Sequence, residues 1–193
     1  MLLRRFHVPY LLLALLIILL SLLPDSMQQA LQYQRNAISN GQLWRLFSGH
    51  LLHSNHWHLL MNLAGLVLAM LLHSHYYRAT SLCWQLTLSA LLISLALYCF
   101  SADIVVYVGL SGVLHSMLTL GALHDIQLKM TTGWLLLAGL MIKVGWEQWQ
   151  GPDAQLAELI NASVATDAHL YGVCAGLVVA ALARLTLLIS DKK

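Results

Sequence analysis

Charged residues are scarce in this sequence. Only 9% of its 193 residues are Asp, Glu, Lys or Arg, whereas 59% are hydrophobic. A soluble domain usually has about 25% charged residues, so this chain has too little polar surface for a water-soluble fold. Its net charge of +2 is small and dispersed. Such a charge excludes the strongly basic surface that binds nucleic acid. The only role that we assign to the basic residues is to orient the chain in the membrane.

Cysteine is also scarce. Cys83, Cys99 and Cys174 lie in apolar segments and have no CxxC spacing. Their odd number excludes a complete disulfide framework. Free cysteine is among the most buried residue types, so we interpret all three as small buried apolar side chains.

A cleavage site is missing after the first apolar stretch. Residues 8–23 follow Arg4 and Arg5, as the apolar part of a signal peptide would, but Pro24 and Asp25 come next instead of a small-x-small motif. The sequence therefore predicts that this stretch is retained as the first helix.

Several apolar stretches approach the ~20 residues that are needed to cross a hydrocarbon core. We predict an all-α membrane protein, embedded in the lipid bilayer, in which residues 1–193 form a single domain with no appended soluble module. The six transmembrane helices are expected near residues 8–23, 57–74, 80–100, 112–127, 132–149 and 167–189.

The basic residues predict the orientation of the chain, because cytoplasmic loops are enriched in Lys and Arg. With both termini in the cytoplasm, seven basic residues fall on that side and three on or near the outer side. The outer segments are then residues 24–56, which read as an interfacial loop, and residues 150–166. The cytoplasmic set is Arg4, Arg5, Arg78, Lys129, Arg184, Lys192 and Lys193, and the outer set is Arg35, Arg45 and Lys143.

The second predicted helix carries two polar residues, His58 and Asn62, among apolar neighbours. Their spacing of four places them on one helical face. Polar residues at membrane depth are costly without a partner or a cavity, which makes both of them candidates for a functional site. Asn also serves as a plain hydrogen-bonding contact between helices, and this alternative stays open for Asn62.

Ser111 lies between two glycines, Gly109 and Gly112, which interrupt the apolar run that follows Phe100. Glycine permits a sharp entry into a helix. Irregular backbone at membrane depth is tolerated only where protein covers it or water reaches it. The sequence therefore predicts a re-entrant loop before the fourth helix, lining a wet cavity.

The last predicted helix has His169, Gly172 and Gly176 on one face. The glycines would let a neighbouring helix approach closely. If that neighbour is the helix that begins at Ser111, the imidazole and the hydroxyl meet. Asp167 is two residues from His169 and so on another face. We expect it to cap the helix N-terminus, and we predict a Ser–His dyad without a carboxylate.

Three further histidines, His50, His53 and His56, suggest a zinc site. No Cys or carboxylate completes a ligand set there, so we predict no metal site.

Taken together, four motifs resemble the rhomboid family of intramembrane serine proteases. They are Trp44-Arg45 in the first outer loop, His58-x-x-x-Asn62, Gly109-Leu110-Ser111-Gly112 and His169-x-x-Gly172-x-x-x-Gly176. The resemblance implies that Ser111 is the nucleophile, that His169 is its general base, and that His58, Asn62 and the backbone N–H of Ser111 hold the oxyanion. It implies no cofactor and no metal. Many rhomboids have a tyrosine four residues after the serine; this chain has His115, whose ring is expected to stack on His169.

The strings Gly-Leu-Ser-Gly-Val-Leu-His (109–115) and Asp-Ala-His-Leu-Tyr-Gly (167–172) are similar to those of rhombosortase, a bacterial branch of the family. This likeness implies an inner-membrane protease with its active site towards the periplasm. Its substrates would be membrane-anchored proteins with a C-terminal tail of Gly-Gly, a membrane helix and a basic end. The alternatives are a general rhomboid protease for other single-pass proteins, a catalytically inactive rhomboid-like protein that binds membrane clients, and, outside the family, a transporter or channel.

Overall fold

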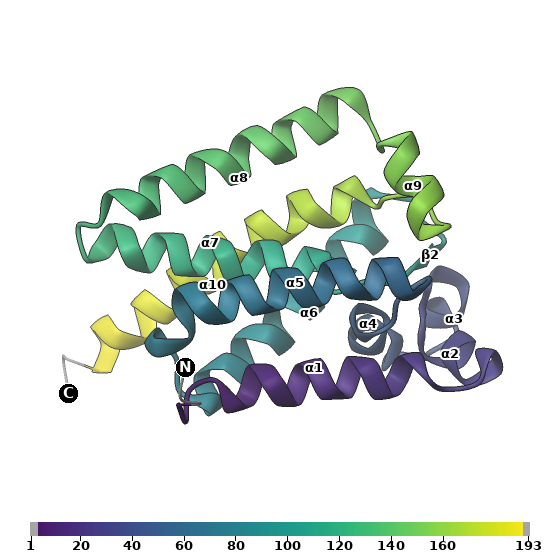
Figure 1. Ribbon diagram of the computed structural model, residues 1–193, viewed down its shortest axis with the longest axis horizontal. Helices are drawn as coiled ribbons and strands as arrows, with labels where there is room; N and C mark the ends of the chain where they lie inside the picture. The colour runs from purple at the N-terminus through teal and green to yellow at the C-terminus, as the bar shows by residue number, and fades with distance from the viewer. Residues whose placement is uncertain (1–3, 191–193) are drawn as a thin grey trace.

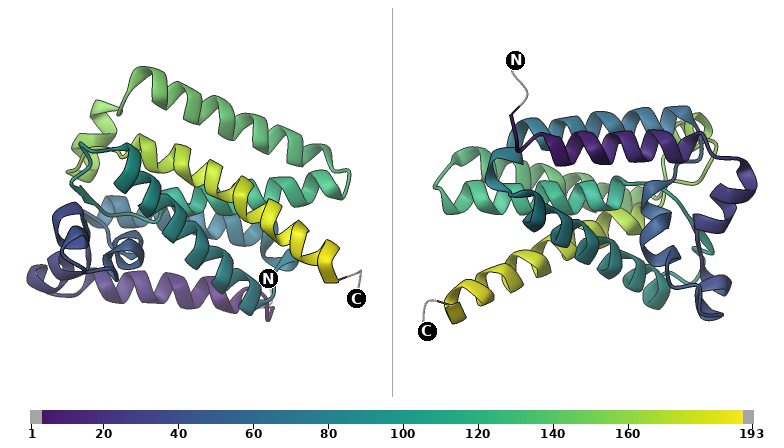
Figure 2. Two further views of the ribbon diagram at one scale, coloured as in Figure 1. Left: turned by 180° about the vertical axis from the view of Figure 1, so that it is seen from behind. Right: turned by 90° about the horizontal axis from the view of Figure 1, so that it is seen from below.

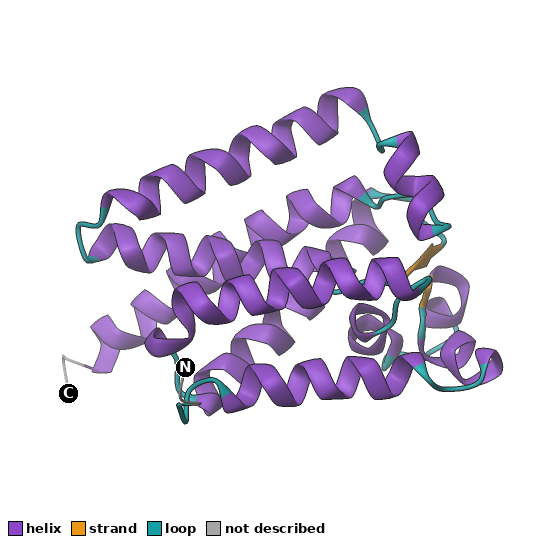
Figure 3. Ribbon diagram, in the orientation of Figure 1, coloured by secondary structure: helices purple, strands orange, loops and turns teal. Residues whose placement is uncertain are grey.

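The computed structural model describes the backbone of residues 4–190 and the side chains of residues 4–185. Figure 1 and Figure 3 show a helical molecule. Its described residues also contain one very short two-stranded ladder. The long helices are α1 (Val8–Ser21), α5 (His56–His73), α6 (Ala79–Phe100), α7 (Ser111–Gln127), α8 (Thr131–Gln150) and α10 (Thr166–Ser190). The short elements are α2 (Asp25–Leu31), β1 (Tyr33–Gln34), α3 (Arg35–Ser39), α4 (Arg45–Ser48), η1 (Gly49–Leu51), η2 (Ser74–Tyr76), β2 (Val106–Tyr107) and α9 (Ala154–Ile160).

The six long helices coincide with the six predicted ranges, and most of their ends lie within one residue of the prediction. The main difference is α1, which ends at Ser21 instead of residue 23. Pro24 explains the difference, because the residue before a proline is pushed out of the helical conformation. The start of α5 is fixed by Asn55, whose side chain accepts a hydrogen bond from the backbone N–H of His58 at 2.9 Å.

Among the described residues, three helical segments are long and apolar enough to cross a membrane: His56–Tyr76, Ala79–Phe100 and Thr166–Leu185. The helix α1 has 14 residues and rises only about 21 Å at 1.5 Å per residue. The helix α8 has 20 residues, but it carries Lys143 and Glu147. Composition and length therefore identify three spans directly, whereas the prediction was six.

The segments predicted as loops are more ordered than expected. Residues 24–56 contain α2, β1, α3, α4 and η1, and residues 150–166 contain α9. The segment before Ser111 contains β2, which pairs antiparallel with β1 through Tyr33 opposite Tyr107 and Gln34 opposite Val106. Backbone pairing between segments more than seventy residues apart has no local sequence signal, which is why it was not predicted.

The two ends of the bundle differ. Figure 1 and Figure 2 show the described ends of the chain, at Arg4 and Ser190, at one end of the bundle and the elements α2, α3, α9 and β2 at the other. The N-terminal ends of α5, α7 and α10 point towards this second end. The residues singled out by the sequence, Ser111, His58 and His169, occur in the first turns of these helices and are thereby brought to one region.

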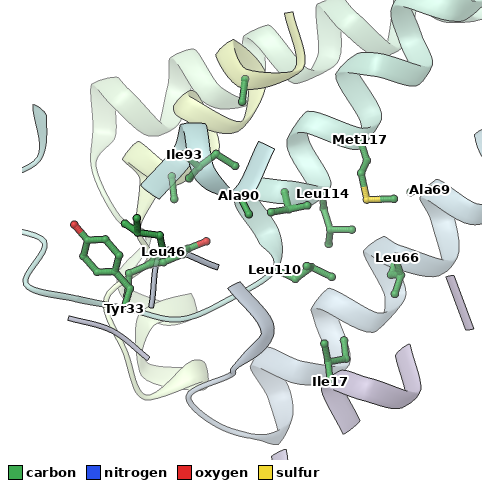
Figure 4. Close-up of a cluster of buried hydrophobic side chains, with 14 of the residues drawn as sticks. Ile17, Tyr33, Leu46, Leu66, Ala69, Ala90, Ile93, Leu110, Leu114 and Met117 are labelled. Atoms are coloured by element: carbon green, nitrogen blue, oxygen red, sulfur yellow. The ribbon is translucent and has the colours of Figure 1, made fainter. Parts of the chain in front are cut away.

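The core forms around α7. Figure 4 shows Leu114 and Met117 of α7, with Leu110 just before it, between Leu66 and Ala69 of α5 and the residues Ala90 and Ile93 of α6. All of these side chains are buried. The helix α7 is thus surrounded by neighbours, and its position is set by apolar packing on several sides.

The outer surface of the helices is apolar as well. Large side chains such as Leu12, Leu135 and Ile142 are more than half exposed. An extensive exposed apolar surface is what a lipid-facing protein presents. The prediction of buried cysteines was wrong, because Cys83, Cys99 and Cys174 are all exposed on this surface. Lipid-facing positions accept the same apolar residue types as the core, so residue type alone did not separate the two.

Candidate active site

One cavity of about 730 Å³ gathers the polar residues that the sequence singled out. Its walls come from α2, α5, α7, α8, α9 and α10 and from the segment that contains β2. The polar side chains that matter for chemistry are His53, His58, Asn62, Ser111, His115, Lys143 and His169. Clustered titratable and nucleophilic groups in a cavity mark it as the candidate active site.

Ser111 is the first residue of α7 and is delivered by a tightly held turn. Gly109 has φ +129°, a conformation that L-residues rarely adopt, and a side chain there would collide with the ring of His58. The hydroxyl of Tyr107 donates to the carbonyl of Gly109 at 2.6 Å, and the N–H of Gly109 donates to the carbonyl of Gly49 at 3.2 Å. The turn therefore fixes where the serine hydroxyl enters the cavity.

His169 lies in the first turn of α10, and its Nε2 is 2.9 Å from Oγ of Ser111. Two glycines permit this approach. A Cβ on Gly112 would lie 2.8 Å from the carbonyl oxygen of Ala168, and a Cβ on Gly172 would overlap the carbonyl oxygen of Gly112. The glycine face predicted for the last helix thus packs on α7, and it brings the imidazole within hydrogen-bonding distance of the hydroxyl.

Asp167 differs from the prediction. It lies inside the first turn of α10, which begins at Thr166, so it is not the N-cap residue. Its carboxylate accepts a hydrogen bond from Oγ of Ser101 at 2.5 Å, and that hydroxyl also lies 2.9 Å from the hydroxyl of Tyr171. Asp167 therefore ties the start of α10 to the end of α6 and, as predicted, faces away from His169.

His58 and Asn62 line the same cavity from α5. Ser54 holds the ring of His58 at Nδ1, with Oγ at 3.0 Å, and the Nε2 edge of the ring lies against Gly109. The side-chain amide of Asn62 donates to the carbonyl of His58 at 3.0 Å, which uses one of its two N–H donors. Both residues are buried, and both therefore face a cavity and not lipid.

His115 stacks on His169, as predicted from its place four residues after the serine. The ring centroids are 4.3 Å apart and the ring planes are 18° from parallel. Nδ1 of His115 lies 2.7 Å from the carbonyl oxygen of Ser111. A carbonyl only accepts, so Nδ1 carries the ring proton and donates it, which holds the ring in place.

Sequence reasoning missed a carboxylate. Glu147 of α8 places Oε2 2.9 Å from Nδ1 of His169, and Lys143 lies one turn earlier with Nζ 2.8 Å from Oε1 of Glu147. The prediction of a dyad without a carboxylate considered only Asp167, the nearest acid in the sequence. A glutamate one turn after a lysine within an apolar helix was the available signal, because such charges at membrane depth usually pair.

Trp44 and Arg45 organise the segment of residues 24–56. The buried guanidinium of Arg45 donates to the carbonyls of Gln29 and Gln32 at 2.8 and 2.7 Å, and Nε1 of Trp44 donates to the carbonyl of Ala30 at 3.1 Å. These bonds fold α2 and α4 against each other. Both residues therefore support the segment beside the cavity.

The three histidines considered for zinc do not converge. His50 bonds the hydroxyl of Ser94 at 2.9 Å, and burial lowers its pKa to about 4. His53 packs edge-on against His58 with centroids 5.1 Å apart; burial lowers its pKa to about 3, and in the described part of the chain neither ring nitrogen has a hydrogen-bond partner. His56 is exposed. The histidines with potential ligand atoms close together are instead His115 and His169, with Glu147.

Comparison with known proteins identifies the family of this chain. The family model described as Rhomboid domain matches residues 40–185, about three quarters of the chain. No curated protein matches the sequence. Rhomboid proteins are intramembrane serine proteases that act on membrane proteins within the bilayer. The matched segment extends from before Trp44 to beyond Gly176 and so contains all four motifs, and the chain belongs to the rhomboid family.

Proposed function

We propose that this protein is an intramembrane serine endopeptidase in which Ser111 is the nucleophile and His169 the general base. The observation that carries the proposal is the 2.9 Å contact between Oγ of Ser111 and Nε2 of His169 inside a cavity. A serine hydroxyl is a weak nucleophile until an adjacent base accepts its proton. In the proposed reaction Oγ attacks the scissile carbonyl, Nε2 accepts the proton, and the resulting imidazolium later protonates the leaving amine.

We assign the oxyanion site to the backbone N–H of Ser111 together with the side chains of His58 and Asn62. The first four N–H groups of a helix lack partners within the helix, so the N–H of Ser111 at the start of α7 is free to donate into the cavity. His58 and Asn62 line that cavity from the opposite helix. Each donor aimed at the developing negative charge is typically worth about 3 kcal/mol of transition-state stabilisation.

The proposed placement has six crossings, with both termini in the cytoplasm and the cavity towards the outer side. In this placement α1, α7 and α8 cross together with the three long apolar helices, and residues 101–110 form a re-entrant segment. The single domain then covers residues 1–193. The uneven distribution of Lys and Arg supports this orientation, and in a bacterium the membrane would be the inner membrane.

The substrate class that we propose is a membrane-anchored protein with a C-terminal Gly-Gly, a membrane helix and a basic end. The support is the likeness of residues 109–115 and 167–172 to rhombosortase. Glycine favours cleavage physically, since a helix must unwind before its carbonyl can reach the serine, and each glycine destabilises a helix by about 1 kcal/mol relative to alanine.

The test is co-expression with a secreted reporter that bears such a tail. We expect a shortened, released product with the wild type and none with Ser111→Ala, and we expect that replacing the two glycines by leucines suppresses the release. In parallel, a fluorophosphonate probe should label the wild type and not Ser111→Ala.

Each alternative gives a different result in this experiment. A general rhomboid protease would cleave the leucine reporter as well as the original and would cleave other single-pass substrates better. A rhomboid-like protein without activity would show neither label nor release that depends on Ser111, and that result would leave client binding as its function.

A further inference from the structure

A second set of polar contacts surrounds the far side of His169. Nδ1 of His169 lies 2.9 Å from Oε2 and 3.1 Å from Oε1 of Glu147. Nζ of Lys143 lies 2.8 Å from Oε1 of Glu147, 3.0 Å from Nε2 of His115 and 3.2 Å from Nδ1 of His169. The side chains of Glu147 and His169 are 17% and 9% exposed, whereas that of Lys143 is 46% exposed.

We propose that Glu147 is a positioning residue that holds His169 in the tautomer that can accept a proton from Ser111, and that Lys143 is the counter-cation that holds Glu147. The inference rests on the proposed protease function and extends the Ser–His pair to a Ser–His–Glu unit. Of the two reacting side chains, Ser111 and His169, Glu147 contacts only His169. It therefore acts through the imidazole and not on the substrate.

The tautomer follows from the partners of the two ring nitrogens. A neutral imidazole has one N–H donor and one bare nitrogen that accepts. The carboxylate of Glu147 only accepts, so it favours the proton on Nδ1 and leaves Nε2 bare opposite the hydroxyl of Ser111. This is the arrangement that a general base requires. A carboxylate at this position also stabilises the imidazolium that forms when the proton is taken up.

Lys143 makes the carboxylate necessary. An ammonium only donates, and Nζ is close enough to Nδ1 of His169 to donate to it. If Glu147 were absent, this donation would favour the tautomer in which Nδ1 is bare and Nε2 carries the ring proton. A protonated Nε2 could not accept the proton of the Ser111 hydroxyl. The positive charge would also oppose formation of the imidazolium. With Glu147 present, the ammonium instead binds Oε1 and the Nε2 of His115.

His115 fits the same network. Its Nδ1 donates to the carbonyl of Ser111, so its Nε2 is bare and accepts from Lys143. Every ring nitrogen in the group therefore has a complementary partner when Nδ1 of His169 is protonated. One potential ligand atom from each of His115, Glu147 and His169 lies within 4.8 Å of the other two, as the ligands of a metal ion would. The ammonium of Lys143 lies within 3.2 Å of one atom from each of them, so the chain supplies its own cation at this point.

The test uses the full-length protein in detergent, with fluorophosphonate labelling and cleavage of the tailed reporter as readouts. We expect Glu147→Ala to reduce both rates at least a hundredfold, mainly in kcat for the reporter. The double variant Glu147→Ala with Lys143→Met should recover at least tenfold over Glu147→Ala, because the competing donor is gone. Lys143→Met alone should stay within about tenfold of the wild type. Glu158→Ala on α9, an exposed carboxylate outside the cavity wall, is the matched control and should leave both rates unchanged.

A spectroscopic readout separates positioning from a general loss of structure. In protein with ¹⁵N-labelled histidine, the His169 signal, identified by its loss in His169→Gln, should report Nδ1–H in the wild type and Nε2–H in Glu147→Ala. An unchanged tautomer, full activity of Glu147→Ala, or a double variant no better than Glu147→Ala would each overturn the proposal. Wild type that shows no labelling dependent on Ser111 would instead overturn the protease function itself, whatever the tautomer.

Discussion

Asn62 and His58 illustrate, at the scale of single residues, why position matters more than type. Both are polar side chains on an apolar helix, and both are buried. One donor of Asn62 is already used within α5, by the carbonyl of His58. Simple interhelical contact would require a partner on another helix. The hydrogen bond from Asn62 to His58 instead lies within α5, and it holds the Asn62 side chain at the wall of the cavity. This arrangement favours a role in binding a ligand.

For these two residues we expect that His58→Ala and Asn62→Ala each lower kcat by about tenfold to a thousandfold with little change in KM. The reason is that an oxyanion donor acts mainly in the transition state. Part of the activity should survive, because the other donors remain. Steady-state cleavage of the tailed reporter measures both constants.

His56→Ala is the control for that measurement, since it makes the same histidine substitution on the same helix at an exposed position. It should behave as the wild type. If His58→Ala and Asn62→Ala both kept full turnover, the two residues would have a role in helix packing and not in holding the oxyanion.

At the scale of helices, the packing of α7 on α10 decides whether the serine and the histidine meet. Gly112 and Gly172 lie opposite each other, and Gly176 continues the contact one turn further, where a Cβ would lie 2.8 Å from Cβ of Thr119. In a membrane, small residues allow such close backbone approach, and packing replaces the hydrophobic effect as the driving force between helices.

A single methyl group at this contact should therefore separate the two helices. We expect Gly172→Ala to destabilise the protein by about 1–3 kcal/mol, the usual cost of overpacking, and to reduce cleavage strongly by lengthening the Oγ to Nε2 distance. Thermal unfolding in detergent and reporter cleavage would measure the two effects.

Gly139→Ala on α8 is the matched control, because nothing lies within 4 Å of a Cβ at that position. Alanine has the higher helix propensity, so this variant should be as stable as the wild type or more stable. A Gly172→Ala variant that unfolded and cleaved like Gly139→Ala would show that the close approach is not required.

At the scale of the whole molecule, the two ends of the bundle define an orientation. The described ends of the chain, at Arg4 and Ser190, lie at one end of the bundle, and the elements α2, α3, α9 and β2 lie at the other (Figure 1). A chain with an even number of crossings returns to its starting side, which agrees with this arrangement. The cytoplasmic positions predicted for Lys192 and Lys193 concern residues outside those that the structure describes.

From this arrangement we expect both termini in the cytoplasm and the 24–56 and 150–166 segments on the outer side, in accordance with the distribution of Lys and Arg. Reporter fusions at each terminus, combined with accessibility of single cysteines placed in α9, would measure it. If the termini were found on the outer side, the proposal that the cavity faces the outer side would be wrong.

The sequence by itself determined the class of the protein, the extent of the six long helices and the residues that were expected to meet. Hydrophobicity and local signals suffice for these, because a helix in lipid satisfies its own backbone hydrogen bonds and its length must match the bilayer. The motifs around Ser111 and His169 were also readable, since each lies within one helical turn.

Only the tertiary structure decided which carboxylate faces His169, which cysteines face outwards and how β1 pairs with β2. Glu147 is 22 residues from His169 along the chain, and its approach depends on how α8 packs beside α10. Asp167 is nearer in sequence, yet the 3.6-residue helical repeat turns it towards Ser101. The spacing of residues along the chain determines which side chains share one face of a helix. Contacts between helices depend instead on tertiary packing, which no local sequence pattern encodes.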